Sequence, residues 1–286
     1  MLAELLKRLL SGTRPPAATP PPEPPRIPHP GTLEHMLWQR HPDAAAPHDL
    51  HLRTLFDGLR VGDRDFNDLM QQALTQSSSS IPGIKLVRRH AATWNLIRYF
   101  LHARRIPGAW AECGVYSGAS ALALCLAARA EDPAFDGSGL HLLDSFEGLS
   151  APVEEDAIRT AGEDGAARER PPLIPKENLR APIGIVTRAM REFPGVRIAK
   201  GWIAEVFAQL PETTWSFVHL DVDLYEPTLE SLEYFVPRLA SGGVVVCDDY
   251  GALGFPGAAR AWDSYFSEPA RPFVVLPTGQ SVFIGS

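Results

Sequence analysis

The amino-acid sequence predicts an α/β protein with a doubly wound, mostly parallel sheet of seven strands, preceded by a helical extension. From residue 108 onward, short apolar runs alternate with amphipathic stretches of helical length. Such alternation is typical of a parallel sheet with helices on its faces. The 286 residues are 45% hydrophobic, which is enough to bury one substantial core.

Composition divides the chain into three segments, residues 1–30, 31–107 and 108–286. Within the first, leucines at helical spacing in residues 1–12 predict a short amphipathic helix. This helix would bind a partner or associate with itself in a homo-oligomer, and the alternative is a frayed tail. Residues 13–30 contain nine prolines, so they are expected to form an extended linker. The second segment is expected to be largely helical and to supply a lid, and the third to form the sheet domain.

The elements of the sheet domain follow one another in a regular order. Strands are predicted at residues 109–115, 140–146, 196–201, 216–223, 242–250, 272–277 and 280–285. Helices are predicted at residues 117–130, 177–192, 226–240 and 257–268, with a short helix after 201 and a polar loop at 150–175. Ligands of such sheets bind at the carboxyl ends of the strands. The acidic residues that end predicted strands are Glu112, Asp144, Asp221, Asp223, Asp248 and Asp249.

Charge and cysteine content restrict the function further. The formal net charge of −7 and the pI near 5.7 argue against nucleic-acid and membrane-surface partners and favour a small-molecule substrate. The N-terminal helix is too short and too charged to span a membrane, and it lacks the features of a signal peptide. Cys113, Cys125 and Cys247 are far apart in apolar segments, which predicts reduced core cysteines in a cytoplasmic protein.

A glycine-containing turn after the first strand predicts a cofactor site. Gly114 and Gly118 lie between the predicted strand and helix, where backbone N–H groups are free to bind a ligand. Tyr116 stands where a dinucleotide-binding turn requires its second glycine, so NAD is disfavoured. Glu112 and Asp144 end successive strands, and an acidic residue there commonly binds ribose hydroxyls. An ordinary turn with a capping aspartate is the alternative.

Carboxylates at two later strand ends predict a metal site. The period of a strand places His219, Asp221 and Asp223 on one face, and Asp248–Asp249 end the next strand. Oxygen ligands of this kind suit Mg²⁺, Mn²⁺ or Ca²⁺. The alternative is that Asp248 and Asp249 cap a turn while Asp221 pairs with an arginine. A single strand histidine such as His219 is more often a packed core residue than a catalyst.

The chain resembles the macrocin O-methyltransferase family of antibiotic-sugar methylating enzymes. The resemblance runs from about Ile81 to the C-terminus and is carried by the motifs ECGVYSG, LLDSFEGL, KGWIAE, TGQ and FVHLDVDLYEPTLESLEYFVPRLASGGVVVCDDYG. It implies a class I, S-adenosylmethionine-dependent O-methyltransferase, a fold whose final strand is antiparallel. The chain departs from the family pattern at Glu205, where the family usually has an aspartate, and in the proline-rich residues before position 31.

The resemblance also implies roles for individual residues. Asp221, Asp248 and Asp249 would bind Mg²⁺, and Asp223 would be the general base, so that Asp221 and Asp223 form the catalytic pair. The methyl donor would contact Glu112, Gly114, Val115, Tyr116, Ser117, Asp144, Ser145, Phe146, Trp202 and Ile203, covered by residues 80–84. The acceptor would be a hydroxyl of a small molecule, typically one oxygen of a sugar diol.

Two other functions remain as alternatives at this point. A nucleotide-dependent oxidoreductase would share the doubly wound sheet, although Tyr116 and the carboxylate cluster argue against it. A non-catalytic binding module would keep the fold and act through its N-terminal helix and proline tract. The four intact aspartates, from Asp221 to Asp249, argue against such loss of activity. The sequence does not identify the acceptor or the hydroxyl that is methylated.

Overall fold

The computed structural model describes residues 56–79, 84–161, 167–172, 179–267 and 271–286. The predicted N-terminal helix, the proline-rich linker and nearly all of the predicted donor-covering segment lie outside these residues. Among the described helices, none is both long and apolar enough to cross a membrane.

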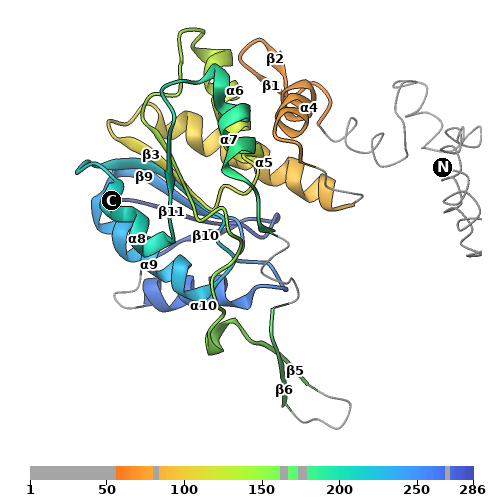
Figure 1. Cartoon of the computed structure of the whole chain (residues 1–286), viewed down its shortest axis with the longest axis vertical. Coiled ribbons are helices and arrows are strands. Elements are labelled where there is room, and N and C mark those ends of the chain that lie inside the picture. Colours follow the sequence, from red (N-terminus) through yellow and green to blue (C-terminus); the bar gives the residue numbers. More distant parts are fainter. Residues whose placement is uncertain (1–55, 80–83, 162–166, 173–178, 268–270) are drawn as a thin grey trace, which may run out of the picture. The chain divides into compact units, whose positions relative to one another are not determined.

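The structure contains the predicted seven-stranded sheet (Figure 1). Its strands lie in the order β10 (Val274–Val275), β11 (Ser281–Ile284), β9 (Leu239–Cys247), β8 (Trp215–Leu220), β3 (Ala109–Cys113), β4 (Leu140–Asp144) and β7 (Arg197–Lys200). β11 is antiparallel to β9 and β10, whereas all other pairs are parallel. The doubly wound, mostly parallel sheet and its antiparallel last strand are therefore confirmed.

The order of the strands determines where a ligand can bind. From β3 the chain adds β4 and then β7 on one side, and it then crosses to add β8 and β9 on the other side. The direction of winding reverses between β3 and β8, which leaves a crevice at the carboxyl ends of these two strands.

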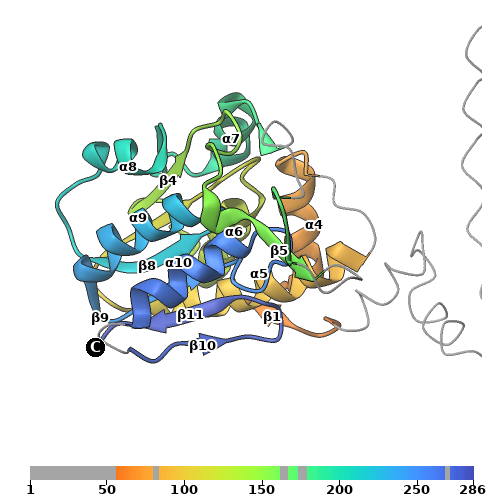
Figure 2. The ribbon, with the colours of Figure 1, turned by 90° about the horizontal axis from the view of Figure 1, so that it is seen from below.

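Helices cover both faces of the sheet (Figures 1 and 2). They are α4 (Phe66–Gln76), α5 (Ile84–Ala103), α6 (Ala119–Glu131), α7 (Ile183–Ala189), α8 (Ile203–Val206), α9 (Tyr225–Phe235) and α10 (Pro256–Ser267). The first four pack on one face and the last three on the other. Figure 2 shows α9 and α10 side by side, in agreement with their many mutual contacts.

Alternate residues of each strand enter different cores. In β8, Phe217 belongs to the core under α5 and α6, whereas the adjacent Val218 belongs to the core under α9 and α10. Leu142 and Leu143 of β4 divide in the same way. Because successive strand residues point to opposite faces, a run of apolar residues fills both cores, as expected for a fully covered parallel sheet.

Three details differ from the prediction. The second segment is not wholly helical, because β1 (Arg60–Val61) and β2 (Arg64–Asp65) form a small hairpin around Gly62, whose φ is +57°. The predicted polar loop contains a second hairpin, β5 (Ile158–Ala161) and β6 (Ala167–Arg170). Its charged strands show no apolar alternation, so the sequence carried no strand signal. The predicted helix at 177–192 is shorter, since α7 begins only at Ile183 after Pro182.

Candidate active site

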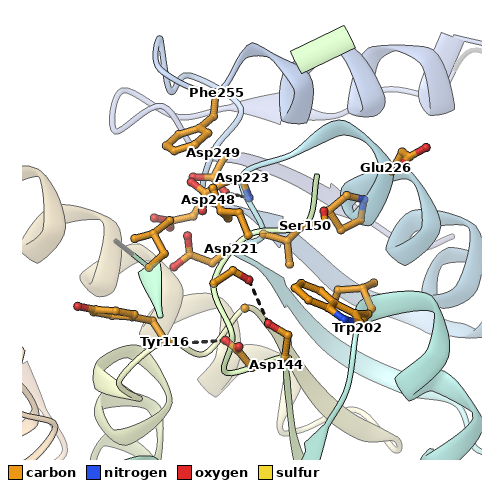
Figure 3. A pocket seen from close by; sticks show the side chains of 18 of the residues that line it. Tyr116, Asp144, Ser150, Trp202, Asp221, Asp223, Glu226, Asp248, Asp249 and Phe255 are labelled. Atoms are coloured by element: carbon orange, nitrogen blue, oxygen red, sulfur yellow. Dashed lines mark hydrogen bonds between the residues drawn. The ribbon is translucent and has the colours of Figure 1, made fainter. Parts of the chain in front are cut away.

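Five neighbouring parallel strands, β9, β8, β3, β4 and β7, end at one edge of the sheet and border a single cavity. Its volume is about 480 Å³, which is within the usual range for small-molecule sites, about 300–1,000 Å³. Figure 3 shows Asp144 and Trp202 on one side of this cavity and the four aspartates from Asp221 to Asp249 on the other. The cavity therefore joins the two predicted sites.

The glycine turn lies close against the neighbouring strand. Gly114 has a φ of +83°, and a Cβ added to it would lie 1.9 Å from the carbonyl oxygen of Asp221. Its N–H group donates to the carbonyl oxygen of Leu143 at 2.9 Å. Only glycine allows both this backbone conformation and this close approach. The turn thus brings the backbone after β3 directly against Asp221.

Asp144 holds the same turn through its side chain. Its Oδ2 accepts hydrogen bonds from the N–H groups of Val115 at 2.7 Å and Tyr116 at 2.9 Å, and its Oδ1 accepts one from Phe146 at 2.6 Å. Tyr116 and Phe146 have left-handed φ values of 51° and 57°, which cost energy in residues other than glycine. Asp144 therefore stabilises the strained turn as well as lining the cavity.

The residues predicted to contact the methyl donor fall into two groups. One group lines the cavity and consists of Gly114, Tyr116, Asp144, Ser145, Trp202 and Ile203. The other is buried behind this surface, with exposed fractions of at most 4%, and consists of Glu112, Val115, Ser117 and Phe146. The second group supports the turn from below instead of forming its surface.

Glu112 and His219 form a buried polar network beneath the cavity. The Glu112 Oε1 accepts a hydrogen bond from Ser120 Oγ at 2.5 Å and lies 3.7 Å from His219 Nδ1. His219 Nε2 lies 3.7 Å from Asp248 Oδ1, which also accepts a hydrogen bond from Gln280 at 2.8 Å. Burial lowers the pKa of His219, but the Asp248 and Glu112 carboxylates outweigh this effect and raise it to about 10. His219 therefore lies between two carboxylates, which favour its protonated form.

The end of β8 differs from the prediction in a way that matters for chemistry. The strand ends at Leu220, although the N–H group of Asp221 still donates to the carbonyl oxygen of Cys113 at 2.9 Å. Asp223 has a left-handed φ of 64°, and its N–H group donates to Asp249 Oδ2 at 3.0 Å. Val218, Leu220 and Val222 therefore share one core, as predicted, and His219 and Asp221 keep the opposite face, whereas the chain turns at Asp223. His219 remains buried and both aspartates reach the cavity.

The crowded aspartates have strongly altered pKa values. Burial raises the pKa of Asp223 well above its usual range, and the neighbouring Asp221 raises it further. Burial and the charge of Asp223 act in the same way on the pKa of Asp249. Burial and Asp248 raise the pKa of Asp221 to about 6. Although burial opposes it, contacts with His219, Arg89 and Gln280 hold the pKa of Asp248 below its usual range.

Arg89 of α5 supplies positive charge to this cluster. Its Nη1 lies 3.6 Å from Asp221 Oδ2 and 3.9 Å from Asp248 Oδ2. The alternative in which Asp221 pairs with an arginine is thus present in the structure. As the side chains lie, no group of three or more His, Cys, Asp or Glu residues in the described part of the chain could hold a metal ion. The metal site stays a prediction.

The chemistry of the donor set nevertheless fits a hard divalent cation. Four carboxylates converge on the cavity wall, and Arg89 forms ion pairs with two of them, Asp221 and Asp248. Carboxylate oxygens of this kind are ligands that Mg²⁺ prefers. A cation held here would stabilise the ionised cluster.

Several cavity residues were not anticipated from the sequence. They are Arg88, Arg89, Leu149, Ser150, Glu230 and Phe255. Arg88 and Arg89 belong to a helix that lies far from the aspartates in sequence, and Leu149 and Ser150 belong to an irregular segment. Neither pair of residues comes directly after a strand end, and a position directly after a strand end was the signal by which the aspartates were predicted.

Comparisons with known proteins show the family to which the chain belongs. A sequence profile described as macrocin-O-methyltransferase (TylF) matches residues 90–270. A tetracenomycin 4'-O-methyltransferase of Streptomyces olivaceus, named for a dimethoxyrhamnosyl substrate, is 32% identical over 152 residues, 51% of this chain and 54% of that protein. The demethyldecarbamoylnovobiocin O-methyltransferase of Streptomyces niveus is 30% identical over 166 residues, 56% of this chain and 58% of that protein. The matches thus span just over half the length of these curated relatives.

Solved structures share the fold. The O-methyltransferase NovP has a TM-score of 0.54 and 23% identity, over 70% of this chain and 80% of that chain. The calicheamicin methyltransferase CalS11 has a TM-score of 0.56 and 19% identity, over 80% of this chain and 97% of that chain. The sheet order and these likenesses give the chain the class I methyltransferase fold. Since the family profile matches well over half of its residues, the chain belongs to the macrocin-O-methyltransferase family.

Proposed function

We propose that the protein transfers a methyl group from S-adenosylmethionine to a hydroxyl of a small molecule, with Mg²⁺ as the metal. The observation that carries this proposal is the single cavity that joins the Gly114–Asp144 turn to the aspartate cluster. Transfer between two substrates requires both to be held next to each other. The cavity provides that arrangement, because one side, with Gly114 and Asp144, suits the nucleoside of the donor and the other side carries the aspartates.

The methyl donor would bind on the side of the cavity formed by the turn. Asp144 would accept hydrogen bonds from the ribose hydroxyls, and the exposed indole of Trp202, which is 38% accessible, would offer a flat apolar surface. The carboxylates on the opposite wall would favour the positive sulfonium by attraction. The donor methyl would then face the aspartates.

Asp223 would act as the general base. The acceptor hydroxyl would pass its proton to an Asp223 carboxylate oxygen while the hydroxyl oxygen forms a bond to the methyl carbon. The methyl–sulfur bond breaks in the same step, and its electron pair stays on sulfur, which becomes the neutral thioether of S-adenosylhomocysteine. The position of Asp223 in the cavity wall, beside the three proposed metal ligands, supports this role.

Mg²⁺ would be held by Asp221, Asp248 and Asp249, and when bound it would lower the pKa of the acceptor hydroxyl as a Lewis acid. The convergence of these carboxylates on the cavity wall supports this assignment. Arg89, which contacts two of these aspartates, would have to move away from at least one of them. The acidity of the cavity wall also supports an acceptor without negative charge.

The acceptor would be a sugar hydroxyl of a glycosylated natural product. Support comes from the family and from the relative named for a rhamnosyl-tetracenomycin substrate. The names of these relatives favour a role in antibiotic biosynthesis, and the free, buried cysteines Cys113, Cys125 and Cys247 fit a reducing compartment such as the cytoplasm. The curated matches cover only part of each relative, so the acceptor is assigned by class and not by compound.

The test is a methylation assay with mass detection. The purified full chain would be incubated with S-adenosylmethionine, MgCl₂ and one acceptor at a time. The acceptors would be 8-demethyl-8-(2,3-dimethoxy-α-L-rhamnosyl)-tetracenomycin C, demethyldecarbamoylnovobiocin and a simple catechol. We expect a glycosylated acceptor to gain one CH₂ unit in mass.

Calorimetry separates the competing functions. The methyltransferase binds S-adenosylmethionine and not NAD, an oxidoreductase of this fold would bind NAD, and a non-catalytic module would bind neither. Tight binding of NAD without binding of S-adenosylmethionine would reject the proposed function.

A further inference from the structure

Asp156 is a buried carboxylate for which the proposed reaction has no use. Asp156 is the last residue of a short 3₁₀ turn, Glu154–Asp156, in the segment that follows β4. Only 1% of its surface is exposed. Its Oδ1 accepts a hydrogen bond from the N–H group of Tyr225 at 2.7 Å, and its Oδ2 accepts one from Val153 at 2.8 Å. Both oxygens are therefore committed to backbone donors.

The Tyr225 contact provides a cap that α9 lacks in its own sequence. The helix begins at Tyr225, and its N-cap residue, Leu224, has no side chain that could accept a hydrogen bond. The first N–H groups of a helix have no partner within the helix, and a negative charge stabilises this end. Asp156, which lies 69 positions away in sequence, supplies both the acceptor and the charge.

Helix α10 leaves room for this contact. A Cβ added to Gly257, near the start of α10, would lie 1.8 Å from Asp156 Oδ1 and 2.8 Å from the Tyr225 nitrogen. Arg260 of the same helix donates to the carbonyl oxygens of Glu155 and Ala157. Burial raises the pKa of Asp156, while the two N–H donors and Arg260 oppose this. Three separate parts of the chain thus meet at one carboxylate.

Each of these three parts also contributes to the cavity wall. The segment after β4 contributes Gly148, Leu149 and Ser150, α9 contributes Glu226 and Pro227, and the loop before α10 contributes Phe255. In Figure 3, Ser150, Glu226 and Phe255 lie around the aspartate side of the cavity. Tyr225 itself follows Asp223 by two positions.

We infer that Asp156 is a positioning residue that fixes the acceptor side of the cavity by capping α9 from the β4–α7 segment. Its carboxylate holds Tyr225, and with it the backbone on which Asp223 stands, against the segment that carries Ser150. The functional part of this inference rests on the proposed methyl transfer. The capping contact does not, so the two can fail separately.

The contact is tested by hydrogen exchange of the Tyr225 amide, followed by NMR in the full chain. Asp156→Ala removes both acceptors, and we expect the amide to exchange about ten-fold faster or more, the effect of losing one strong hydrogen bond. Asp156→Asn keeps one acceptor oxygen and should give a smaller increase. Glu155→Ala, at the exposed neighbouring position, is the matched control and should leave the amide unchanged.

Gly257→Ala tests the same contact from α10. The added methyl group would push the Asp156 carboxylate away from Tyr225, so this variant should speed exchange of the same amide. Combining it with Asp156→Ala should add little, because the contact can be lost only once. The inference is overturned if the Tyr225 amide exchanges as slowly in Asp156→Ala as in the wild type. If Asp156→Ala does not fold, the same result in both Asp156→Asn and Gly257→Ala overturns it.

Kinetics test the functional part. With the rhamnosyl-tetracenomycin acceptor, Asp156→Ala should raise the acceptor KM about ten-fold and leave the calorimetric affinity for S-adenosylhomocysteine unchanged. A merely structural role would weaken both together, which would contradict positioning. If Tyr225 loses protection but the wild-type protein methylates no acceptor, the capping contact stands and the proposed function is rejected.

Discussion

At the scale of single residues, Asp144 shows what a sequence can and cannot reveal. Its place at the end of a strand predicted a role in binding the donor, and the structure puts it in the cavity wall. Its three hydrogen bonds to Val115, Tyr116 and Phe146 could not be predicted, because they depend on left-handed backbone at two of those residues. A substitution therefore affects the turn as well as the ligand.

Replacing Asp144 should weaken donor binding measurably. We expect Asp144→Ala to cost about 1–3 kcal/mol of S-adenosylmethionine affinity, since charge-assisted hydrogen bonds are lost at a partly buried site. Asp144→Asn keeps one acceptor oxygen and should lose less. Titration calorimetry measures both, with circular dichroism to show that the fold is retained. Equal affinity in wild type and Asp144→Ala would remove Asp144 from the donor site.

The aspartates of the proposed metal site should respond differently from the proposed base, Asp223. Asp221→Asn removes a charged ligand, so we expect Mg²⁺ to bind about ten-fold more weakly or worse, with part of the activity restored by added MgCl₂. Asp263→Asn is the control, because Asp263 bonds to the Tyr250 hydroxyl at 2.9 Å and lies outside the cavity wall. Mg²⁺ affinity that is equal in Asp221→Asn and wild type would contradict the assigned ligand.

At the scale of the elements, the glycine turn after β3 is the clearest case of a local sequence signal. The sequence predicted a turn at Gly114 with backbone N–H groups free to bind a ligand, and in the structure the carbonyl of Asp221 lies close against this turn. The end of β8 is the opposite case. Alternation of apolar and polar residues continues through Asp223 in the sequence, but the strand stops at Leu220. Asp249 accepts the Asp223 N–H group, and such a tertiary contact leaves no local pattern.

Gly114→Ala should destabilise the fold through this turn. The added methyl group meets the Asp221 backbone and the residue must keep a φ of +83°, so we expect a loss of about 2–5 kcal/mol in the free energy of unfolding. Gly184→Ala is the matched control. Gly184 lies in α7 with nothing within 4 Å of an added Cβ, so alanine there should stabilise by about 0.5–1 kcal/mol. Urea denaturation of both variants measures the difference.

If Gly114→Ala unfolds at the same urea concentration as the wild type, the turn accommodates an added methyl group, which would contradict the close contact with the Asp221 backbone. Gly184→Ala controls for the general effect of replacing glycine by alanine, because both variants make the same chemical change.

At the scale of the whole molecule, the sheet was predictable because its strands are buried on both faces. Apolar runs such as Val244–Cys247 are short and rich in β-branched residues, and they alternate with helices along the chain. This order is typical of a parallel sheet with helices on both faces. The four aspartates from Asp221 to Asp249 were predictable as well, because they directly follow the ends of two of these strands. Arg89 and Asp156 were not, because their partners come from distant parts of the chain.

The N-terminal residues should be dispensable for the chemical step. The proline-rich residues 13–30 follow the N-terminal helix predicted at residues 1–12, and the described residues from Phe56 onward form one compact unit. We expect a chain that begins at residue 31 to keep the kcat of the full chain. Circular dichroism would check its fold. A large fall in kcat with the fold retained would show that these residues take part in the reaction.

The central claim is that methyl transfer takes place in this cavity and that Asp223 accepts the proton. The most direct measurement is single-turnover methyl transfer to the rhamnosyl-tetracenomycin acceptor at saturating S-adenosylmethionine and MgCl₂, with the product detected by mass. Asparagine tolerates the left-handed φ of Asp223, so Asp223→Asn changes the base with little change in backbone.

We expect the wild-type protein to form the methylated product, EDTA to stop it, and Asp223→Asn to be about 10²–10⁴-fold slower with unchanged affinity for S-adenosylmethionine. Transfer by Asp223→Asn at the wild-type rate, or undiminished transfer in EDTA, would contradict the account.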